Sequence, residues 1–345
     1  MLQELIRLHL FGHTIPIYGY GFMLVVGFFA CMFVGQWIAR HIGIDPDTLI
    51  NAVLLGIVTG MIGARLCSVL ENFSYYFPPG RSLWEDLKYA ANFQEGGLTF
   101  YGGFLLATPC LIAYARWHRI PVLRGMDMVA PLLLIGLGLG RVGCYLNGCC
   151  YGERCDTGIG VRFPYYSEAY MDQFSKGEVQ PPRELMRTEK DGEIDLISPY
   201  DPEMQSNEHL REAAAASRAL PVQPTELYSM VTALLLAGAM IAYLTLPHRD
   251  GSGFALMLIL EGFGRFLLEL VRVEPAVWTL HTRTDSYGVS ISMFLGIANV
   301  IAGAVMWLII RRWGGPVQIP RPLLPLQSAA SPESGTSRPA IAPNQ

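Results

Sequence analysis

Seven long apolar stretches alternate with shorter polar segments along the chain. Each is close to the length of about 20 apolar residues that a helix needs to cross a bilayer. The predicted spans are residues 18–39, 49–70, 98–115, 127–147, 225–246, 253–271 and 290–310. The start of the chain has no long apolar run, so we expect no cleavable signal peptide, and apolar residues at helical spacing over 2–11 favour a short interfacial helix. The pattern predicts an all-α integral membrane protein.

The polar segments divide the chain into regions. Residues 1–313 are predicted to form one polytopic membrane domain, with an aromatic-rich outer loop at 71–97 and a polar extracytoplasmic lobe at 148–224. Residues 314–345 are rich in Pro, Ser and Ala and predict a disordered cytoplasmic tail. No internal repeat is visible, which argues against a transporter built from two duplicated halves.

Composition supports the membrane assignment. The chain has 345 residues, of which 51% are hydrophobic and 16% are charged, whereas soluble domains carry about 25% charged residues. This composition argues against a soluble enzyme. The net charge of −4 comes with no basic stripe, so the sequence shows no nucleic-acid footprint.

Basic residues set the expected orientation, because cytoplasmic loops are enriched in them. The connections after spans one, three and five and the C-terminal flank carry Arg40, Arg116, Arg119, Arg124, Arg249, Arg311, Arg312 and Arg321. The short segments of the other face carry fewer basic residues. We therefore expect the N-terminus outside and the C-terminus in the cytoplasm.

The predicted sixth span carries charges at i, i+4, i+8 and i+11, so they share one helix face. These residues are Glu261, Arg265, Glu269 and Arg272. Charges inside a span are costly and avoid lipid, so this face either pairs with itself to hold the bundle together or lines a functional site. Arg65 and Arg141 lie inside other spans and add positive charge, which favours an anion bound through two-pronged guanidinium contacts.

The polar groups converge on one predicted depth. Arg65 and Arg141 lie near the outer ends of their spans, and Tyr20 and Tyr101 open spans one and three from outside. That depth is level with the outer-leaflet headgroups, so a phospholipid phosphate is the expected anion. Gly102 and Gly103 follow Tyr101 and would allow sharp backbone geometry and close approach of a substrate.

Several motifs together resemble the prolipoprotein diacylglyceryl transferase family. They are YGYGFML (18–24), GARL (63–66), EGGLTFYGGFL (95–105), GLGRVGCYLNGCCYG (138–152), QPTELY (223–228) and GFGRFLLELVR (262–272). Order, spacing and span count all match over about residues 15–310. The resemblance implies an inner-membrane enzyme that moves the diacylglyceryl group of phosphatidylglycerol to the lipobox cysteine of preprolipoproteins, with no metal and no organic cofactor.

The resemblance also implies site residues. Arg141 matches the family's essential arginine in the glycine-rich signature, and Arg265 matches its arginine in the later G-x-x-R-F motif. Tyr20 matches a tyrosine early in span one, and Gly152 matches the glycine that closes the signature. The expected catalytic residues are Arg141, Arg265 and Tyr101. The expected substrate-binding residues are Tyr20, Arg65, Gly102, Gly103, Gly152, Glu269 and Arg272.

Two positions depart from the family pattern. Tyr101 stands where many members have His, and Cys144 where many have Asn. A phenol with a pKa near 10 is a poor base, so the base stays unassigned and Tyr101 is expected to hydrogen-bond the headgroup. A non-catalytic protein or transporter that binds an anion or phospholipid, and an inactive relative, stay open as alternatives.

Four cysteines crowd the segment after span four in the pattern C-x4-C-C-x4-C. They are Cys144, Cys149, Cys150 and Cys155. This spacing is not the paired C-x2-C of zinc sites. Disulfides, free thiols, and a metal or redox role all stay open, although no metal site is expected.

Overall fold

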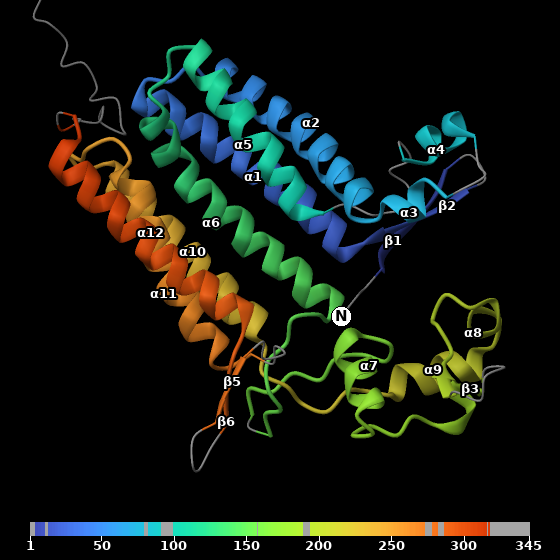
Figure 1. The fold of residues 1–345 in the computed structure, drawn as a ribbon. Coiled ribbons are helices and arrows are strands. Elements are labelled where there is room, and N and C mark those ends of the chain that lie inside the picture. Colours follow the sequence, from blue (N-terminus) through green and yellow to red (C-terminus); the bar gives the residue numbers. More distant parts are fainter. Residues whose placement is uncertain are drawn as a thin grey trace, which may run out of the picture.

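The computed structural model describes residues 4–10, 13–78, 82–90, 99–156, 158–188, 194–272, 278–281, 286–315 and 317. Seven long helices occupy the positions of the predicted spans (Figure 1). They are α1 (Gly19–Ile42), α2 (Pro46–Glu71), α5 (Phe100–Trp117), α6 (Val122–Asn147), α10 (Thr225–Leu244), α11 (Ser252–Glu269) and α12 (Ile291–Trp313). The all-α prediction is confirmed.

Five of these helices are long and apolar enough to cross a membrane. They are α1, α2, α6, α10 and α12. Helices α5 and α11 are shorter, with 18 residues each, and α11 carries Glu261, Arg265 and Glu269 within that length. The protein is thus an all-α integral membrane protein, and the full count of seven spans stays a prediction.

Local signals explain where the helices begin and end. Helix α2 begins after Asp45, whose side chain accepts a hydrogen bond from the Thr48 backbone N–H, which satisfies one free donor of the first turn. Helices α1 and α6 end at Gly43 and Gly148, which have φ of 80° and 76°. Glycine adopts this left-handed conformation without the steric cost that a Cβ adds.

The helices form two groups joined along α6. Helix α6 packs against α1 on one side and against α10 on the other, α2 packs against α5, and α11 packs against α12. Glycines permit the closest pairs: a Cβ on Gly102 of α5 would lie 2.4 Å from the Gly63 carbonyl oxygen of α2. Small residues at such positions let backbones approach each other in lipid.

The outward faces of the helices are apolar. Phe33 of α1 is 78% exposed and Leu235 of α10 is 69% exposed. Water would not favour large apolar side chains in such positions, whereas acyl chains do. The exposed apolar faces therefore belong in a bilayer.

A buried carboxylate fixes α6 and α11 to each other at one end of the bundle. Asp127 of α6 is 2% exposed and accepts hydrogen bonds from the Gly251 N–H at 2.6 Å and the Phe254 N–H at 2.8 Å. A negative group is favourable at the N-terminus of α11, where backbone N–H groups lack helical partners. These two hydrogen bonds tie α6 to the start of α11.

At that opposite end the chain folds into the lobe of residues 148–224. It contains α7 (Glu168–Ser175), the short 3-10 helix η1 (Arg183–Leu185), β3 (Met186–Thr188), β4 (Ile194–Leu196), α8 (Pro202–Ser206) and α9 (Glu208–Ala216). The lobe has its own buried core, which includes Phe163, Tyr170 and Leu185. The hydroxyl of Tyr165 donates to backbone carbonyls within this core. We call this end of the bundle the lobe end (Figure 1).

The prediction of an interfacial helix at residues 2–11 is wrong. Residues Glu4–Leu10 form β1, which pairs antiparallel with β2 (His13–Tyr18). Polar and apolar residues alternate over Arg7–Leu10, and this period of two is that of a strand. The segment also fits helical spacing, but pairing with β2 stabilises the strand.

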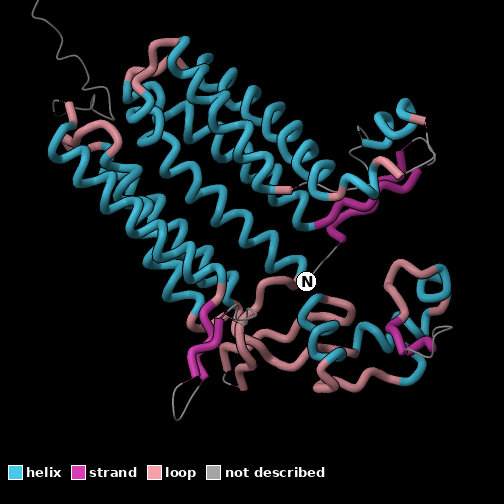
Figure 2. The backbone as a smooth tube through the Cα atoms, viewed as in Figure 1, coloured by secondary structure: helices cyan, strands magenta, loops and turns pink. Residues whose placement is uncertain are grey.

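Other short elements lie near the lobe end. Helices α3 (Phe73–Tyr76) and α4 (Leu83–Ala90) follow α2, and a hairpin of β5 (Trp278–His281) and β6 (Ser286–Val289) precedes α12. In the described residues the sheets are three two-stranded hairpins (Figure 2). The predicted disordered tail at 314–345 lies mostly outside the described residues.

Candidate active site

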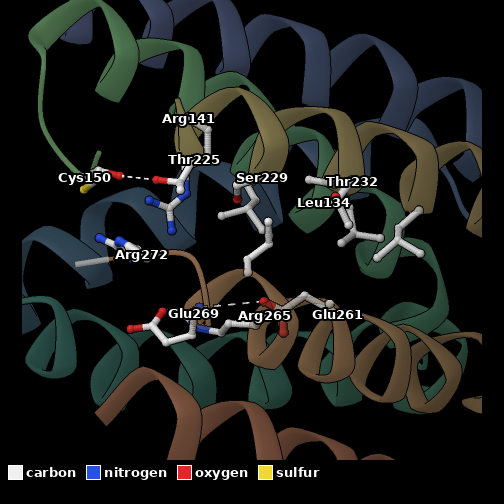
Figure 3. Close-up of a pocket in the computed structure, with 15 residues that line it drawn as sticks. Leu134, Arg141, Cys150, Thr225, Ser229, Thr232, Glu261, Arg265, Glu269 and Arg272 are labelled. Carbon is white, nitrogen blue, oxygen red and sulfur yellow. Dashed lines mark hydrogen bonds and ion pairs between the residues drawn. The ribbon is translucent and has the colours of Figure 1, made fainter. Parts of the chain in front are cut away.

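A pocket lies between α6, α10 and α11 toward the lobe end. Its walls carry three arginines and two glutamates: Arg141 from α6, and Glu261, Arg265, Glu269 and Arg272 from α11 and the residues after it. Thr225, Ser229 and Thr232 of α10 add hydroxyl groups, and leucines such as Leu134 and Leu268 add apolar surface. Figure 3 shows Arg141 and Arg272 at one end of this space and Arg265 beside Glu261.

The pocket arginines differ in the hydrogen bonds and ion pairs that their guanidinium groups form within the protein. In the described part of the chain, Arg141 forms no hydrogen bond and no ion pair. Nη1 of Arg265 lies 3.7 Å from Oε1 of Glu261, while its Nε is buried without a hydrogen-bond partner among the described residues. A buried donor without a partner costs stability, so both guanidinium groups suit an acceptor that comes from outside the protein.

The two pocket glutamates are held by α12 and its cap. Oε1 of Glu269 accepts a hydrogen bond from the Ser290 hydroxyl at 2.8 Å, and Oε2 of Glu261 accepts one from the Asn299 amide at 3.1 Å. The charged face of α11 is therefore not paired only with itself, and Arg141 of α6 adds a third arginine to the same pocket. The geometry therefore favours an anion site over a purely structural ladder.

Sequence reasoning missed a third acidic group near the arginines. Glu226 of α10 is 1% exposed, and both of its carboxylate oxygens lack hydrogen-bond partners among the described residues. It lies within electrostatic reach of Arg141 and Arg272 but does not line the pocket. The motif QPTELY contained this residue, but a single Glu near a predicted helix start gave no sign of burial.

The turn after α6 brings thiols to the pocket edge. Cys144, Cys149 and Cys150 place their sulfurs within 4.8 Å of one another, and Cys150 lines the pocket. The Cys149 thiol donates a hydrogen bond to the Cys144 carbonyl oxygen at 3.6 Å. The pKa of the Cys150 thiol lies below its usual value because the neighbouring thiols of Cys144 and Cys149 and the charges of Arg272 and Arg141 favour its thiolate. Cys144, Cys149 and Cys150 are free thiols in the structure.

Gly152 positions Arg272 by close backbone contact. Its N–H donates to the Gln223 carbonyl at 2.8 Å, and it pairs with Arg272 in an antiparallel bridge. A Cβ at this position would lie 2.5 Å from the Thr225 methyl and 2.8 Å from the Val271 carbonyl oxygen. Only glycine allows the segment after α6 to run against the end of α11.

Comparison with known proteins identifies the family. The family model described as prolipoprotein diacylglyceryl transferase matches residues 7–309. The chain belongs to the prolipoprotein diacylglyceryl transferase family. A phosphatidylglycerol–prolipoprotein diacylglyceryl transferase of Clostridium tetani is 26% identical over 302 residues, which cover 88% of this chain and 96% of the relative.

Two further relatives carry the same name. The protein of Methylobacillus flagellatus is 26% identical over 305 residues and covers 85% of this chain and 91% of the relative. The protein of Rhodopirellula baltica is 31% identical over 167 residues, which are 48% of this chain and 33% of the relative's own length. The family resemblance inferred from the motifs is confirmed.

One group of the predicted site residues lies around the pocket of this family member. Arg141, Arg265, Glu269 and Arg272 line it, and Gly152 adjoins it. Tyr20 lies in α1, where its ring is against the position of Gly143 of α6. It is within electrostatic reach of Arg141 and the three thiols. Tyr20 thus approaches the same end of α6.

A second group lies on the α2–α5 pair and does not line the pocket. Arg65 is 5% exposed, and its guanidinium donates to the carbonyls of Ala90 and Tyr89 and to the Tyr76 hydroxyl at 2.7, 3.0 and 3.1 Å. These contacts tie α3 and α4 to α2. The expected substrate contact of Arg65 therefore stays a prediction, and the structure adds a positioning role.

Tyr101, Gly102 and Gly103 belong to the same pair of helices. A Cβ on Gly102 or Gly103 would meet the backbone of α2, so both glycines serve helix packing here. Tyr101 is 63% exposed at the N-terminal end of α5, which lies at the lobe end of the bundle (Figure 1). Its expected catalytic role stays a prediction.

Proposed function

We propose that this chain transfers the diacylglyceryl group of phosphatidylglycerol to the lipobox cysteine thiol of a preprolipoprotein and releases glycerol phosphate. The observation that carries the proposal is the pocket, in which Arg141 of α6 meets Arg265 and Arg272 of the α11 segment. The names of the related proteins state the same lipid and the same class of protein substrate.

The arginines would bind the lipid phosphate. Arg141 has its donors available, and Nε of Arg265 is buried without a partner among the described residues. A guanidinium presents parallel N–H groups to two phosphate oxygens. Leucines that line the pocket, such as Leu134 and Leu268, would contact the start of the acyl chains.

The reaction is a single displacement. The sulfur of the lipobox cysteine, as thiolate, forms a bond to C3 of the diacylglyceryl glycerol. The C3–O bond breaks, and its electron pair stays on the phosphate oxygen of the leaving glycerol phosphate. The thiol proton passes to solvent. The arginines stabilise the charge that develops on the leaving group and favour ionisation of the incoming thiol.

We propose that the lobe end faces outward from a bacterial inner membrane. The opposite end carries the basic last turns of α1, with Arg40, and of α12, with Arg311 and Arg312, as expected of cytoplasmic flanks. A tag at residue 185 should report outside, and tags at 120 or 330 should report inside. The reverse pattern would place the pocket at the wrong leaflet and contradict the proposal.

Reconstitution tests the activity directly. The purified protein is placed in vesicles with phosphatidylglycerol and a peptide that carries a lipobox, and the peptide mass is followed. We expect a mass increase of one diacylglyceryl group, which is absent when the peptide cysteine is replaced by serine or when phosphatidylethanolamine is the lone lipid.

Phosphatidylglycerol binding without any peptide mass change would support a non-catalytic lipid-binding protein instead. Neither binding nor transfer would favour an inactive relative. Either result contradicts the proposed transferase activity.

A further inference from the structure

The three thiols at the pocket edge form a compact group that the transfer reaction does not use. Cys144 lies in the last turn of α6, and Cys149 and Cys150 follow the left-handed Gly148. The Gly148 and Cys149 N–H groups both donate to the Cys144 carbonyl, at 2.9 and 3.2 Å. This turn folds the chain back, so that three sulfurs lie within 4.8 Å of one another.

The group is held in place against local strain. Cys150 has φ of 68°, a left-handed conformation that a residue with a Cβ adopts at an energetic cost. The Thr225 hydroxyl of α10 donates to the Cys150 carbonyl at 2.8 Å, and the Gly152 N–H donates to the Gln223 carbonyl. Such strain persists where the surrounding structure fixes it, and it gathers at functional sites.

We propose that Cys144, Cys149 and Cys150 form a three-thiolate site for a thiophilic cation of the Zn²⁺ class. Zn–S bonds are about 2.3 Å long, so three sulfurs around one tetrahedral ion lie about 3.8 Å apart. The observed sulfurs need to close by about 1 Å at most to reach that spacing. All three residues are half-buried, so their sulfurs are not sealed in the protein core. Three protein ligands leave a tetrahedral ion one further position for water or another ligand.

The surrounding charges suit such a site. Three thiolates and one Zn²⁺ carry a net single negative charge after the thiol protons leave to solvent. The guanidinium groups of Arg141 and Arg272 lie within electrostatic reach of Cys150 and offset this charge. Because Cys150 also lines the pocket, a bound cation would sit at the edge of the anion site.

Metal titration of the full-length protein in detergent tests the site. The protein is reduced, freed of reductant without oxygen, and titrated with Co²⁺ as a spectroscopic probe. We expect a near-ultraviolet thiolate-to-cobalt charge-transfer band that saturates at one ion per chain and is removed by Zn²⁺. Cys144→Ser, Cys149→Ser and Cys150→Ser should each weaken binding by more than about tenfold, the lower end of what loss of an outer-shell partner costs at metal sites.

Cys110→Ser is the matched control, because Cys110 is also half-buried but lies in α5. The charge-transfer band of this variant should match that of the wild type. If the site variants do not fold, alkylation of the wild-type protein replaces them: Zn²⁺ should protect Cys144, Cys149 and Cys150 but not Cys110. Absence of the charge-transfer band, equal protection of Cys110, or a disulfide joining two of the three cysteines in protein isolated without reductant would overturn the proposal.

Discussion

Replacing Arg141 with alanine removes a guanidinium that forms no hydrogen bond or ion pair within the described part of the chain. Its contribution should therefore appear in substrate turnover rather than in stability. Two charge-assisted hydrogen bonds to phosphate are worth about 1.5–3 kcal/mol each. Their loss of about 3–6 kcal/mol lowers kcat/KM by about 10²- to 10⁴-fold.

The assay compares kcat/KM for lipobox-peptide lipidation in phosphatidylglycerol vesicles with thermal unfolding of the same preparation. Arg141→Ala should shift Tm by no more than about 2 °C, since a substitution that breaks no contact changes stability by about 0.5 kcal/mol or less. Arg141→Lys keeps the charge and loses the two-pronged geometry, so its rate should fall between those of wild type and the alanine variant.

The control is Arg124→Ala on the same helix. Nε and Nη2 of Arg124 donate to Oδ1 and Oδ2 of Asp250, each at 3.2 Å, at the end of α6 far from the pocket. This variant therefore loses a local contact but leaves the pocket residues in place. Its kcat/KM should change by no more than about fivefold. If kcat/KM of Arg141→Ala equals that of the wild type, the phosphate role of Arg141 is refuted. If kcat/KM falls equally in Arg141→Ala and Arg124→Ala, the loss comes from a disturbed helix bundle.

Three further substitutions separate packing from chemistry. Arg65→Ala removes three hydrogen bonds to α3 and α4, each worth about 0.5–1.5 kcal/mol, so Tm should fall clearly; an unchanged Tm would contradict the positioning role. Tyr101→Phe should lower kcat/KM by about one to two powers of ten, the effect of one lost hydrogen bond to a charged group, and an unchanged rate would remove Tyr101 from the site. Gly102→Ala places a Cβ 2.2 Å from the Cys67 Cβ and should cost about 1–3 kcal/mol in thermal stability. The control is Gly60→Ala, whose added Cβ meets nothing within 4 Å. An equal loss of thermal stability in Gly60→Ala would show that helix crowding is not the cause.

The sequence alone determined the helices and much of the arginine pocket. Apolar runs of membrane length predicted the positions of the seven long helices, α1, α2, α5, α6, α10, α11 and α12, because hydrocarbon requires continuous apolar segments whose backbone groups bond internally. The spacing of Glu261, Arg265 and Glu269 predicted one charged face on α11, because helix periodicity is a local property. At the N-terminus the local pattern predicted a helix where the structure has β1. The same apolar residues suit a helix or a hairpin strand, and pairing with β2 stabilises the strand.

Tertiary structure alone decided which polar groups meet. The linear spacing of Cys144, Cys149 and Cys150 argued against a metal site, yet the turn at Gly148 gathers their sulfurs. Arg65 and Arg141 were equivalent as intramembrane arginines, but α3 and α4 occupy the donors of Arg65, and Arg141 faces the pocket. A side chain's partners depend on which distant segments pack beside it, and hydrophobic periodicity places helices in the bilayer without setting their rotation, tilt or neighbours.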